Sequence, residues 1–296
     1  MKIEAGVLLS RFTTFGSGGP ARAFARPETV VELEQALAWA GERELPPIPI
    51  GFGSNVLVAD AGVEALVLRL QGELAAVRIE GERMSAGGGS PNAVCALKAR
   101  EVGLGGLEFV SSIPGTIGGG VRMNAGAWGW SFADLIERVL VVDASGSRWL
   151  DVEQLGLRYR GSNLGPGEIV AAAEFTLVPR GSDEIKGTTR ELKEKRKSAQ
   201  PINTRTFGSV FKNPEHELSA GRMLDACELR GLQIGAARIS PVHANFIENG
   251  GGATTADALA LMDEARRRAY ERFRVVLEPE VRLVGSISLR PVETDA

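Results

Sequence analysis

The sequence predicts an α+β protein built from two or three domains. Its 296 residues exceed the needs of one small domain and suffice for two or three. Short helical patterns alternate with short strand-like runs in the first third, and the third segment contains a charged helix followed later by a long one. Two glycine-rich loops, at residues 51–55 and 111–129, follow this α/β pattern and are the first candidates for a binding site.

The composition is that of an ordinary soluble globular protein, with 44% apolar and 24% charged residues. A net charge of −3 argues against general attraction to nucleic acid or to an anionic membrane. No run approaches the ~18 apolar residues of a membrane span. Residues 5–9 are too short for the core of a signal peptide. We therefore expect a cytoplasmic protein with neither a nucleic-acid partner nor membrane insertion.

Metal-ligating side chains are sparse. Cys95 and Cys227 are far apart and each lies in an apolar helical pattern, so they fit buried structural thiols rather than a disulfide or a metal site. Thiols of this kind agree with a reducing compartment. His216 and His243 are the two histidines, and we expect no metal site.

The first segment reads as a small βαβ-type unit that ends near residue 75. Pro27 is expected to open a helix that runs to about Ala40, because apolar residues recur there at helical spacing. Strands are expected around Ile48 and Ile50 and at residues 56–58 and 65–70.

The second segment, residues 76–180, is expected to hold one helix and several strands. Ser90 is expected to be the N-cap of that helix, with Pro91 at its first position and its end near Val102. The predicted strands are 76–79, 83–86, 138–143, 148–150 and 169–178.

The third segment, residues 181–296, is expected to contain helices at 183–199 and 256–273. Thr254 with Asp257 approximates a capping box for the second helix. Residues 286–296 show no pattern and are expected to fray. The predicted domains are thus 1–75, 76–180 and 181–296.

Both glycine-rich loops suit a phosphate, since backbone N–H groups free of a neighbouring Cβ can approach its oxygens. Structural turns remain an alternative for each loop alone. Gly51-x-Gly53 lacks the third glycine and the later acidic residue of the dinucleotide fingerprint, which excludes a Rossmann-type dehydrogenase. The second loop lacks the lysine and Ser/Thr of a P-loop. Two loops rich in Ser, Thr and Asn favour a large pyrophosphate-containing ligand held between two subdomains.

Six segments resemble one known family. In chain order they are 51–58 (GFGSNVLV), 109–129 (FVSSIPGTIGGGVRMNAGAWG), 159–164 (YRGSNL), 207–214 (FGSVFKNP), 243–249 (HANFIEN) and 278–285 (EPEVRLVG). This ordered set resembles the UDP-N-acetylenolpyruvoylglucosamine reductases, the MurB family. The resemblance implies a two-subdomain FAD-binding domain of the PCMH/vanillyl-alcohol-oxidase type followed by an α+β substrate-binding domain.

The chain departs from that family pattern at four positions. Phe52 and Arg274 stand where glycine is expected, Gly120 where alanine is expected, and Glu248 where an apolar residue is expected. The stretch from Tyr159 to Ser209 is too short for an additional substrate-capping insertion, so the chain resembles the shorter, type II form.

The reaction that the resemblance implies has two halves. Hydride passes from NADPH to non-covalently bound FAD, and then to the enolpyruvyl group of a UDP-linked amino sugar, giving UDP-N-acetylmuramate for peptidoglycan. The resulting enolate needs a fixed cation, a second electrostatic partner and a proton donor. The resemblance assigns these roles to Arg160, Glu280 and Ser209 respectively.

The residues alone leave these three assignments open. Arg160 has a guanidinium suited to a carboxylate, yet it fits a surface ion pair as well. Ser209 also fits a hydroxyl that satisfies a turn. Glu278 and Glu280 fall on the same face by strand alternation, and only the resemblance selects Glu280, which would have to stay neutral or orient Arg160.

The resemblance also implies two sets of binding residues. The expected FAD-binding residues are Gly51, Gly53, Ser54, Asn55, Val56, Ser111, Ile113, Pro114, Gly115, Thr116, Gly118, Gly119, Asn124, Gly126, Ala127 and Ile169. The expected substrate-binding residues are Tyr159, Arg160, Arg205, Lys212, Asn213, His243 and Asn245.

Two other functions remain compatible with the sequence. One is another PCMH-type flavin oxidoreductase acting on a sugar or alcohol, although neither glycine-rich loop holds a histidine for a covalent flavin link. The other is a nucleotide-sugar-binding regulator without redox activity, which would need neither Ser209 nor Glu280. The sequence leaves the preference between NADPH and NADH open, and it does not reveal the oligomeric state.

Overall fold

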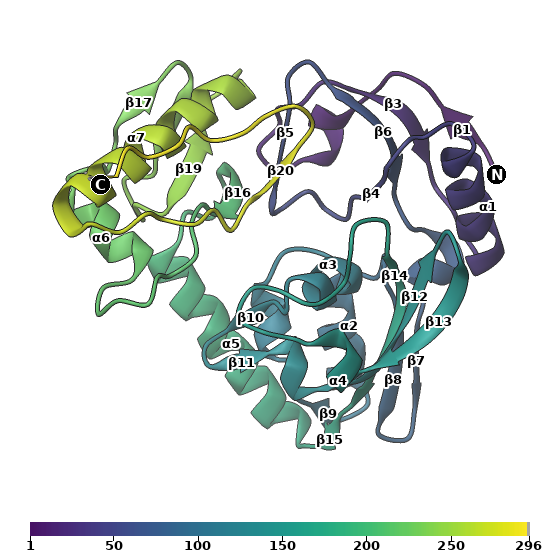
Figure 1. The fold of residues 1–296 in the computed structure, drawn as a ribbon. Helices are drawn as coiled ribbons and strands as arrows, with labels where there is room; N and C mark the ends of the chain where they lie inside the picture. Colours follow the sequence, from purple (N-terminus) through teal and green to yellow (C-terminus); the bar gives the residue numbers. More distant parts are fainter. Residues whose placement is uncertain (295–296) are drawn as a thin grey trace. The chain divides into compact units, whose positions relative to one another are not determined.

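The computed structural model describes residues 1–294, and the chain divides into two compact units (Figure 1). Unit 1 comprises residues 1–5, 22–52 and 64–196, and unit 2 comprises 6–21, 53–63 and the chain from 197 onward. Buried apolar side chains form two clusters in unit 1 and one in unit 2. The division of the chain into three domains, with boundaries at residues 75 and 180, remains a proposal. The three clusters support it.

The first sheet has the strand order β1-β3-β6-β4, and β2 also pairs with β3. Its strands are β1 (Ile3–Glu4), β2 (Val7–Leu8), β3 (Pro20–Ala25), β4 (Pro47–Pro49) and β6 (Val63–Leu68). Helix α1 (Val30–Gly41) follows β3 and buries Leu33 and Leu37 in one cluster of unit 1, together with Leu66 and Leu68. This is the α/β unit that the periodicity of the first segment predicts.

The second sheet is antiparallel, with the strand order β13-β12-β14-β8-β7. Its strands are β7 (Val77–Glu80), β8 (Arg83–Gly87), β12 (Ile136–Asp143), β13 (Gly146–Asp151) and β14 (Ile169–Thr176). Successive residues of β14 point to opposite faces, so Ile169 joins the cluster around α1 while Val170 joins the other cluster of unit 1. Burial on both faces explains the continuous apolar run of this strand.

Helices and short strands of unit 1 carry the loops of interest. Helix α3 packs against β14 and β8, and α2 packs against β7, on the side of the sheet that Figure 1 shows to the left of β14. These elements are α2 (Asn92–Glu101), α3 (Ile117–Arg122), α4 (Val152–Leu155), β9 (Leu104–Gly105), β10 (Gly126–Ala127), β11 (Trp130–Ser131) and β15 (Val178–Pro179). Strands β10 and β11 form a hairpin, and β9 pairs with β15.

Unit 2 contains a four-stranded antiparallel sheet of order β16-β19-β18-β17 and a parallel pair of β20 with β5. Helices α6 and α7 contact each other, and α7 contacts β17 and β18. The strands are β5 (Val56–Val58), β16 (Arg205–Ser209), β17 (Gln233–Ile234), β18 (Ala237–Ile239), β19 (Phe246–Asn249) and β20 (Arg282–Val284). The helices of unit 2 are α6 (Ala220–Ala226) and α7 (Thr255–Phe273). Helix α5 (Ser182–Ala199) comes before them in the chain, and its residues up to 196 belong to unit 1.

Four 3₁₀ segments complete the regular structure of the described chain. They are η1 (Leu9–Phe12), η2 (Gly72–Ala75), η3 (Phe109–Ser112) and η4 (Phe132–Asp134). None of the helices between residues 1 and 294 combines the length and the apolar character needed to cross a membrane.

Two predicted helix starts are wrong and one is confirmed. Helix α1 begins at Val30 rather than Pro27, because Thr29 accepts a hydrogen bond from the amide of Glu32 and so caps it. Pro91, not Ser90, is the N-cap of α2, since the Ser90 hydroxyl donates to the carbonyl of Ala76 at 3.1 Å. The capping box of Thr254 with Asp257 is confirmed for α7.

Three departures from the family pattern have physical explanations. A Cβ on Gly120 would lie 2.4 Å from the ring of Phe132, so glycine makes room for this buried ring. Glu248 is 3% exposed, and Arg238 donates to its carboxylate at 2.9 Å. Arg274 ends α7 in the left-handed conformation, with φ +57°, which explains why glycine is expected there.

The C-terminal tail differs from the expected frayed end. The backbone amide of Arg290 donates to Asp263 at 2.9 Å, and its carbonyl accepts from Arg266 at 2.6 Å, so the tail is fastened to α7. Residues 295–296 lie outside the described part of the chain.

Candidate flavin and substrate site

The two glycine-rich loops meet within unit 1 at Gly51 and Thr116. A Cβ on Gly51 would lie 2.6 Å from the hydroxyl oxygen of Thr116, a distance that no side chain tolerates. Thr116 is 6% exposed, and its hydroxyl does not cap helix α3, which begins at the next residue. Glycine at position 51 therefore allows the first loop to approach the second.

Helix α3 presents glycines of two different kinds. The amides of Ile117 and Gly118 donate to the carbonyls of Ser90 and Gly88 at 2.9 and 2.8 Å, so these N–H groups are already used. A Cβ on Gly118 would lie 3.0 Å from the carbonyl oxygen of Gly88. A Cβ on Gly119 would have only the hydroxyl oxygen of Thr116 nearby, at 3.9 Å. Gly118 serves packing, whereas Gly119 leaves space for a ligand.

Asn92 holds the second glycine-rich loop. Its side-chain amide donates to the carbonyl of Ile113 at 3.2 Å, and its backbone amide donates to Gly115 at 3.1 Å. Its side-chain oxygen is buried and has no hydrogen-bond partner among the described residues. An unsatisfied buried acceptor costs about 1–3 kcal/mol, so this site favours a ligand with hydrogen-bond donors. Sequence reasoning missed Asn92, although its place after Gly87-Gly88-Gly89 is a usable signal.

These features fit FAD, which offers both phosphate oxygens and hydrogen-bond donors. The space beside Gly119 and the backbone of residues 113–116 are suited to the phosphate oxygens. The side-chain oxygen of Asn92 is suited to a hydrogen-bond donor of the ligand. Both cysteines are buried and free, and burial raises the pKa of the Cys95 thiol to about 12. Both histidines belong to unit 2, so no histidine or reactive thiol accompanies the second loop in unit 1.

Other predicted cofactor residues have structural roles of their own. The Ser111 hydroxyl donates to the carbonyl of Glu108 at 2.6 Å, and the side chain of Ile169 is 1% exposed within an apolar cluster. Gly53 has φ +64°, and a Cβ there would lie 2.1 Å from the carbonyl oxygen of Phe12. Gly53, Ser54, Asn55 and Val56 belong to unit 2, whereas the other predicted cofactor residues belong to unit 1.

Arg160 lies in a tight turn of unit 1. The backbone amides of Arg158 and Gly161 donate to each other's carbonyls at 3.0 and 3.1 Å, which leaves Tyr159 and Arg160 as a two-residue tip. Arg160 has φ +53°, a conformation that costs an L-residue roughly 1–2 kcal/mol. Strain of this kind at a predicted catalytic residue points to a functional constraint.

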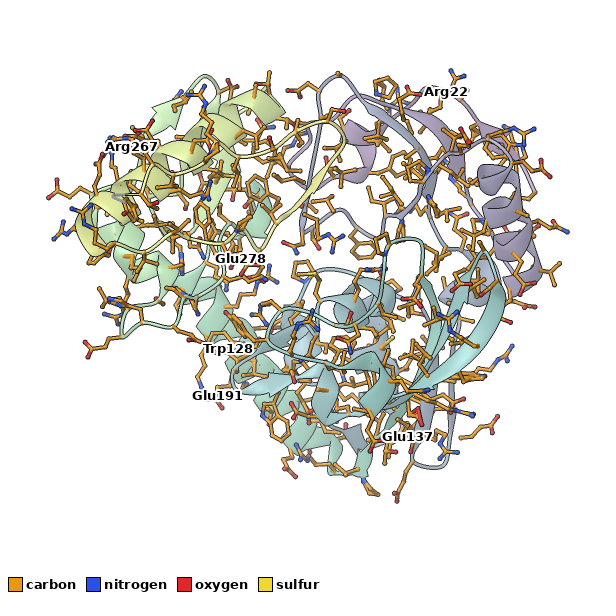
Figure 2. The ribbon with its side chains drawn as sticks, in the orientation of Figure 1. Arg22, Trp128, Glu137, Glu191, Arg267 and Glu278 are labelled. Carbon is orange, nitrogen blue, oxygen red and sulfur yellow. The ribbon has the colours of Figure 1, made fainter. Side chains whose placement is uncertain are left out.

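The Arg160 guanidinium is oriented by two neighbours. It donates to the carbonyl of Gly126 in β10 at 3.1 Å, and it lies 5.1 Å from the centroid of the Tyr159 ring. Tyr159 is 54% exposed, and so is accessible to a ligand. Trp128, at the turn of the β10–β11 hairpin and labelled in Figure 2, is 41% exposed.

Ser209 and Glu280 lie on backbone segments that are hydrogen-bonded together in unit 2. A register shift in β16 before Ser209, with φ +83° at Gly208, bends the strand at this point. The amide of Glu280 then donates to the carbonyl of Val210 at 2.8 Å. The structure thus brings together two predicted catalytic residues that are 71 positions apart in the sequence.

Asn245 and Asn213 fasten the segment that follows Ser209. The Asn245 side chain accepts from the amide of Phe211 at 3.0 Å and donates to its carbonyl at 2.8 Å, and Asn245 is 4% exposed. The Asn213 side-chain oxygen accepts from the amide of Ala220 at 3.1 Å, at the start of α6. Both predicted substrate residues therefore hold backbone in place.

The remaining predicted substrate residues include three basic side chains. Lys212 forms an ion pair with Glu278, whose side chain is labelled in Figure 2, with 2.5 Å between nitrogen and oxygen. Arg205, in β16, is exposed. Burial, and secondarily the charge of Arg230, lowers the pKa of His243. The Nδ1 atom of His243 accepts from the amide of Asn245 at 3.1 Å, so the neutral ring carries its proton on Nε2.

Two regions of the chain match known domain families. Residues 21–150 match the FAD binding domain, and residues 200–284 match the C-terminal domain of UDP-N-acetylenolpyruvoylglucosamine reductase. The chain is 40% identical over 279 residues to the UDP-N-acetylenolpyruvoylglucosamine reductase of Rubrobacter xylanophilus, covering 94% of this chain and 93% of that protein. It is 41% identical over 268 residues to the enzyme of that name from Anaeromyxobacter dehalogenans, covering 90% and 81%.

A solved structure agrees with these matches. The crystal structure of UDP-N-acetylenolpyruvylglucosamine reductase (MurB) from Thermus caldophilus superposes with a TM-score of 0.85 at 38% identity, covering 96% of this chain and 99% of that one. The chain belongs to the UDP-N-acetylenolpyruvoylglucosamine reductase family. Its fold is accordingly a PCMH-type FAD-binding domain with the C-terminal domain of that family, and 296 residues are consistent with the shorter, type II form. It is an FAD-dependent oxidoreductase of peptidoglycan precursor synthesis.

Proposed function

We propose that this chain reduces UDP-N-acetylglucosamine enolpyruvate to UDP-N-acetylmuramate with NADPH, using Arg160, Ser209 and Glu280. The observation that carries the proposal is the backbone bond between Glu280 and Val210, which fixes a carboxyl group and the Ser209 hydroxyl on adjoining segments. An acid and a proton donor held on neighbouring backbone suit a reaction that ends in protonation of an enolate.

FAD, when bound without a covalent link, supplies the hydride that it takes from NADPH. Arg160 binds the substrate carboxylate through its guanidinium, which keeps its charge as electrons move onto that group. Glu280, in its protonated form, donates a hydrogen bond to the enolate. Ser209 gives its hydroxyl proton to the carbon next to the carboxylate and regains a proton from water. A serine is a weak acid, but the enolate is a strong enough base for this transfer.

Binding of the nucleotide part is assigned to the basic groups of unit 2. Lys212 and Arg205 offer positive charge for the diphosphate, and the neutral ring of His243 offers its Nε2 hydrogen as a donor. The buried free thiols Cys95 and Cys227 support a reducing, cytoplasmic location.

Ser209→Ala tests the proposal directly. Reduction of the flavin by NADPH should keep its wild-type rate, whereas reoxidation by the enolpyruvyl substrate should fall by about 10²–10⁴-fold, the usual contribution of a general acid. Ser145→Ala is the matched control, because the exposed Ser145 hydroxyl donates to the Asp143 carboxylate in the turn between β12 and β13, outside every predicted site residue. Equal reoxidation rates in Ser209→Ala and wild type would refute the assigned proton donor.

A further inference from the structure

The turn that carries Arg160 is held by side chains from the C-terminal end of helix α3. Asn124, two residues beyond α3, donates from its side-chain amide to the carbonyl of Arg158 at 3.2 Å. That carbonyl also accepts from the amide of Gly161, so the Asn124 bond acts on the base of the two-residue turn. The oxygen of the same side chain accepts from the amide of Ala133 at 2.9 Å.

Asn124 is buried and has a left-handed backbone conformation. It is 7% exposed and has φ +40°, a conformation that asparagine tolerates better than most residues. Its amide and carbonyl each hold a different segment, one before Arg160 and one after the β10–β11 hairpin. Gly126 of that hairpin accepts the hydrogen bond of the Arg160 guanidinium. Asn124 thus connects the backbone of Arg160 to the element that orients its side chain.

Arg122 fastens the chain on the far side of the turn. Its guanidinium donates to the carbonyls of Leu164, Gly165 and Glu168 at 3.1, 2.9 and 2.7 Å. Its own carbonyl accepts from the Ser162 hydroxyl at 2.9 Å. The segments on both sides of the strained residue Arg160 are therefore anchored to Arg122, the last residue of α3, and to Asn124, two residues beyond it.

We propose that Asn124, assisted by Arg122, is a positioning residue for Arg160 rather than a contact of the flavin. A residue with φ +53° keeps this conformation only where its surroundings impose it, and the bonds of Asn124 and Arg122 provide that constraint. Loss of the Asn124 bond lets the turn relax and moves the guanidinium away from the substrate carboxylate. This inference rests on the function proposed for Arg160.

Asn124→Asp is the sharpest variant, because it keeps the acceptor for Ala133 and removes the donor to Arg158. Loss of this bond should slow reoxidation of the reduced flavin by substrate roughly tenfold. Flavin content and reduction by NADPH should be unchanged. Hydrogen exchange at the amides of Arg158 and Gly161 should be faster, which reports the turn independently of activity. Asn124→Gly is a second variant that suits the backbone conformation and removes both side-chain bonds.

Asn92→Ala is the matched control, since it loses an amide-to-carbonyl bond of the same 3.2 Å length in the same unit. It should weaken flavin retention without changing hydrogen exchange at Arg158 and Gly161. Asn124→Asp should also add little to Arg160→Ala in the double variant, because both changes act through one guanidinium.

The outcomes separate the two proposals. A wild-type reoxidation rate in Arg160→Ala would overturn the role of Arg160 and this inference with it. A slow Arg160→Ala combined with wild-type rate and exchange in both Asn124 variants would overturn the inference alone. Loss of flavin from Asn124→Asp, or effects that multiply in the double variant, would also overturn it and return Asn124 to the cofactor site.

Discussion

The side-chain amide of Asn55 donates a hydrogen bond to the backbone carbonyl of Glu280, with 3.2 Å between nitrogen and oxygen. The Asn55 carbonyl in turn accepts from the amide of Arg282 at 3.0 Å. The first glycine-rich loop therefore holds the strand entry that carries a proposed catalytic carboxyl group. We therefore predict that Asn55 affects the substrate half-reaction through Glu280, separately from its predicted contact with FAD.

Replacing Asn55 by alanine should slow the second half-reaction more than the first. Loss of a bond worth about 1 kcal/mol loosens Glu280 and should slow reoxidation by substrate roughly fivefold at full flavin occupancy. Asn55→Asp should behave alike, because an ionised carboxylate cannot donate to a carbonyl. Stopped-flow reoxidation of the pre-reduced protein measures this. A wild-type rate in both variants would show that the bond does not position Glu280.

Glu278 and Glu280 should give opposite results when each is replaced by glutamine. Glu280→Gln should lower kcat by about 10²-fold or more, because a proton-donating group is lost from the enolate. Glu278→Gln should keep kcat and lower KM, since it releases Lys212 from its ion pair and frees that charge for the diphosphate. Steady-state kinetics with NADPH and substrate tests both. The assignment fails if Glu278→Gln is the variant that loses kcat.

Alanine substitutions at two glycines of helix α3 should have different effects, one on protein stability and the other on FAD binding. Gly120→Ala places a Cβ 2.4 Å from the Phe132 ring and should lower the free energy of unfolding by about 1–3 kcal/mol. Gly119→Ala meets no such obstacle and should leave stability equal or higher, yet weaken FAD binding by filling the space beside the loop. Thermal unfolding of the apoprotein and FAD titration measure the two effects. An unstable Gly119→Ala apoprotein with normal FAD affinity would contradict this distinction.

His243 should make the protein less stable as the pH falls. Burial lowers its pKa below the ordinary value of 6.5 in the folded state, so the unfolded chain takes up the proton more readily. The free energy of unfolding should therefore decrease as the pH falls from about 6.5 to the folded-state pKa, and this loss should be absent above about pH 7.5. Urea unfolding of wild type and His243→Gln between pH 5 and 8 measures the difference. A difference that does not vary with pH would show that His243 is not the titrating group.

The sequence predicted the helices and strands better than the contacts between segments that are distant in the chain. The apolar pattern of residues 256–273 and the capping box before it identified α7, because local hydrogen bonds and periodicity decide such a helix. The start of α2 was wrong, because the Ser90 hydroxyl donates to Ala76, a partner that only the folded chain brings close. The contact of Gly51 with Thr116 and the clamp of Asn124 on Arg158 join segments 65 and 34 positions apart. Periodicity carries no information about contacts of this kind.

The predicted catalytic residues also depend on contacts that form only in the folded chain. Strand alternation could not distinguish Glu278 from Glu280, and the ion pair of Glu278 with Lys212 appears only in the folded chain. The family resemblance selected Arg160, but the left-handed backbone and the supporting bonds of this residue depend on the folded turn. The bonds by which Asn92 holds Ile113 and Asn245 holds Phe211 likewise form only in the folded chain.

An anaerobic titration of the purified protein decides whether both half-reactions take place on the bound flavin. The protein is reduced with one equivalent of NADPH while the visible flavin band is followed, and UDP-N-acetylglucosamine enolpyruvate is then added. The proposed function predicts that the band bleaches with NADPH and returns when the substrate is added, without oxygen. A colourless protein, or a bleached one that recovers only with oxygen, would contradict it.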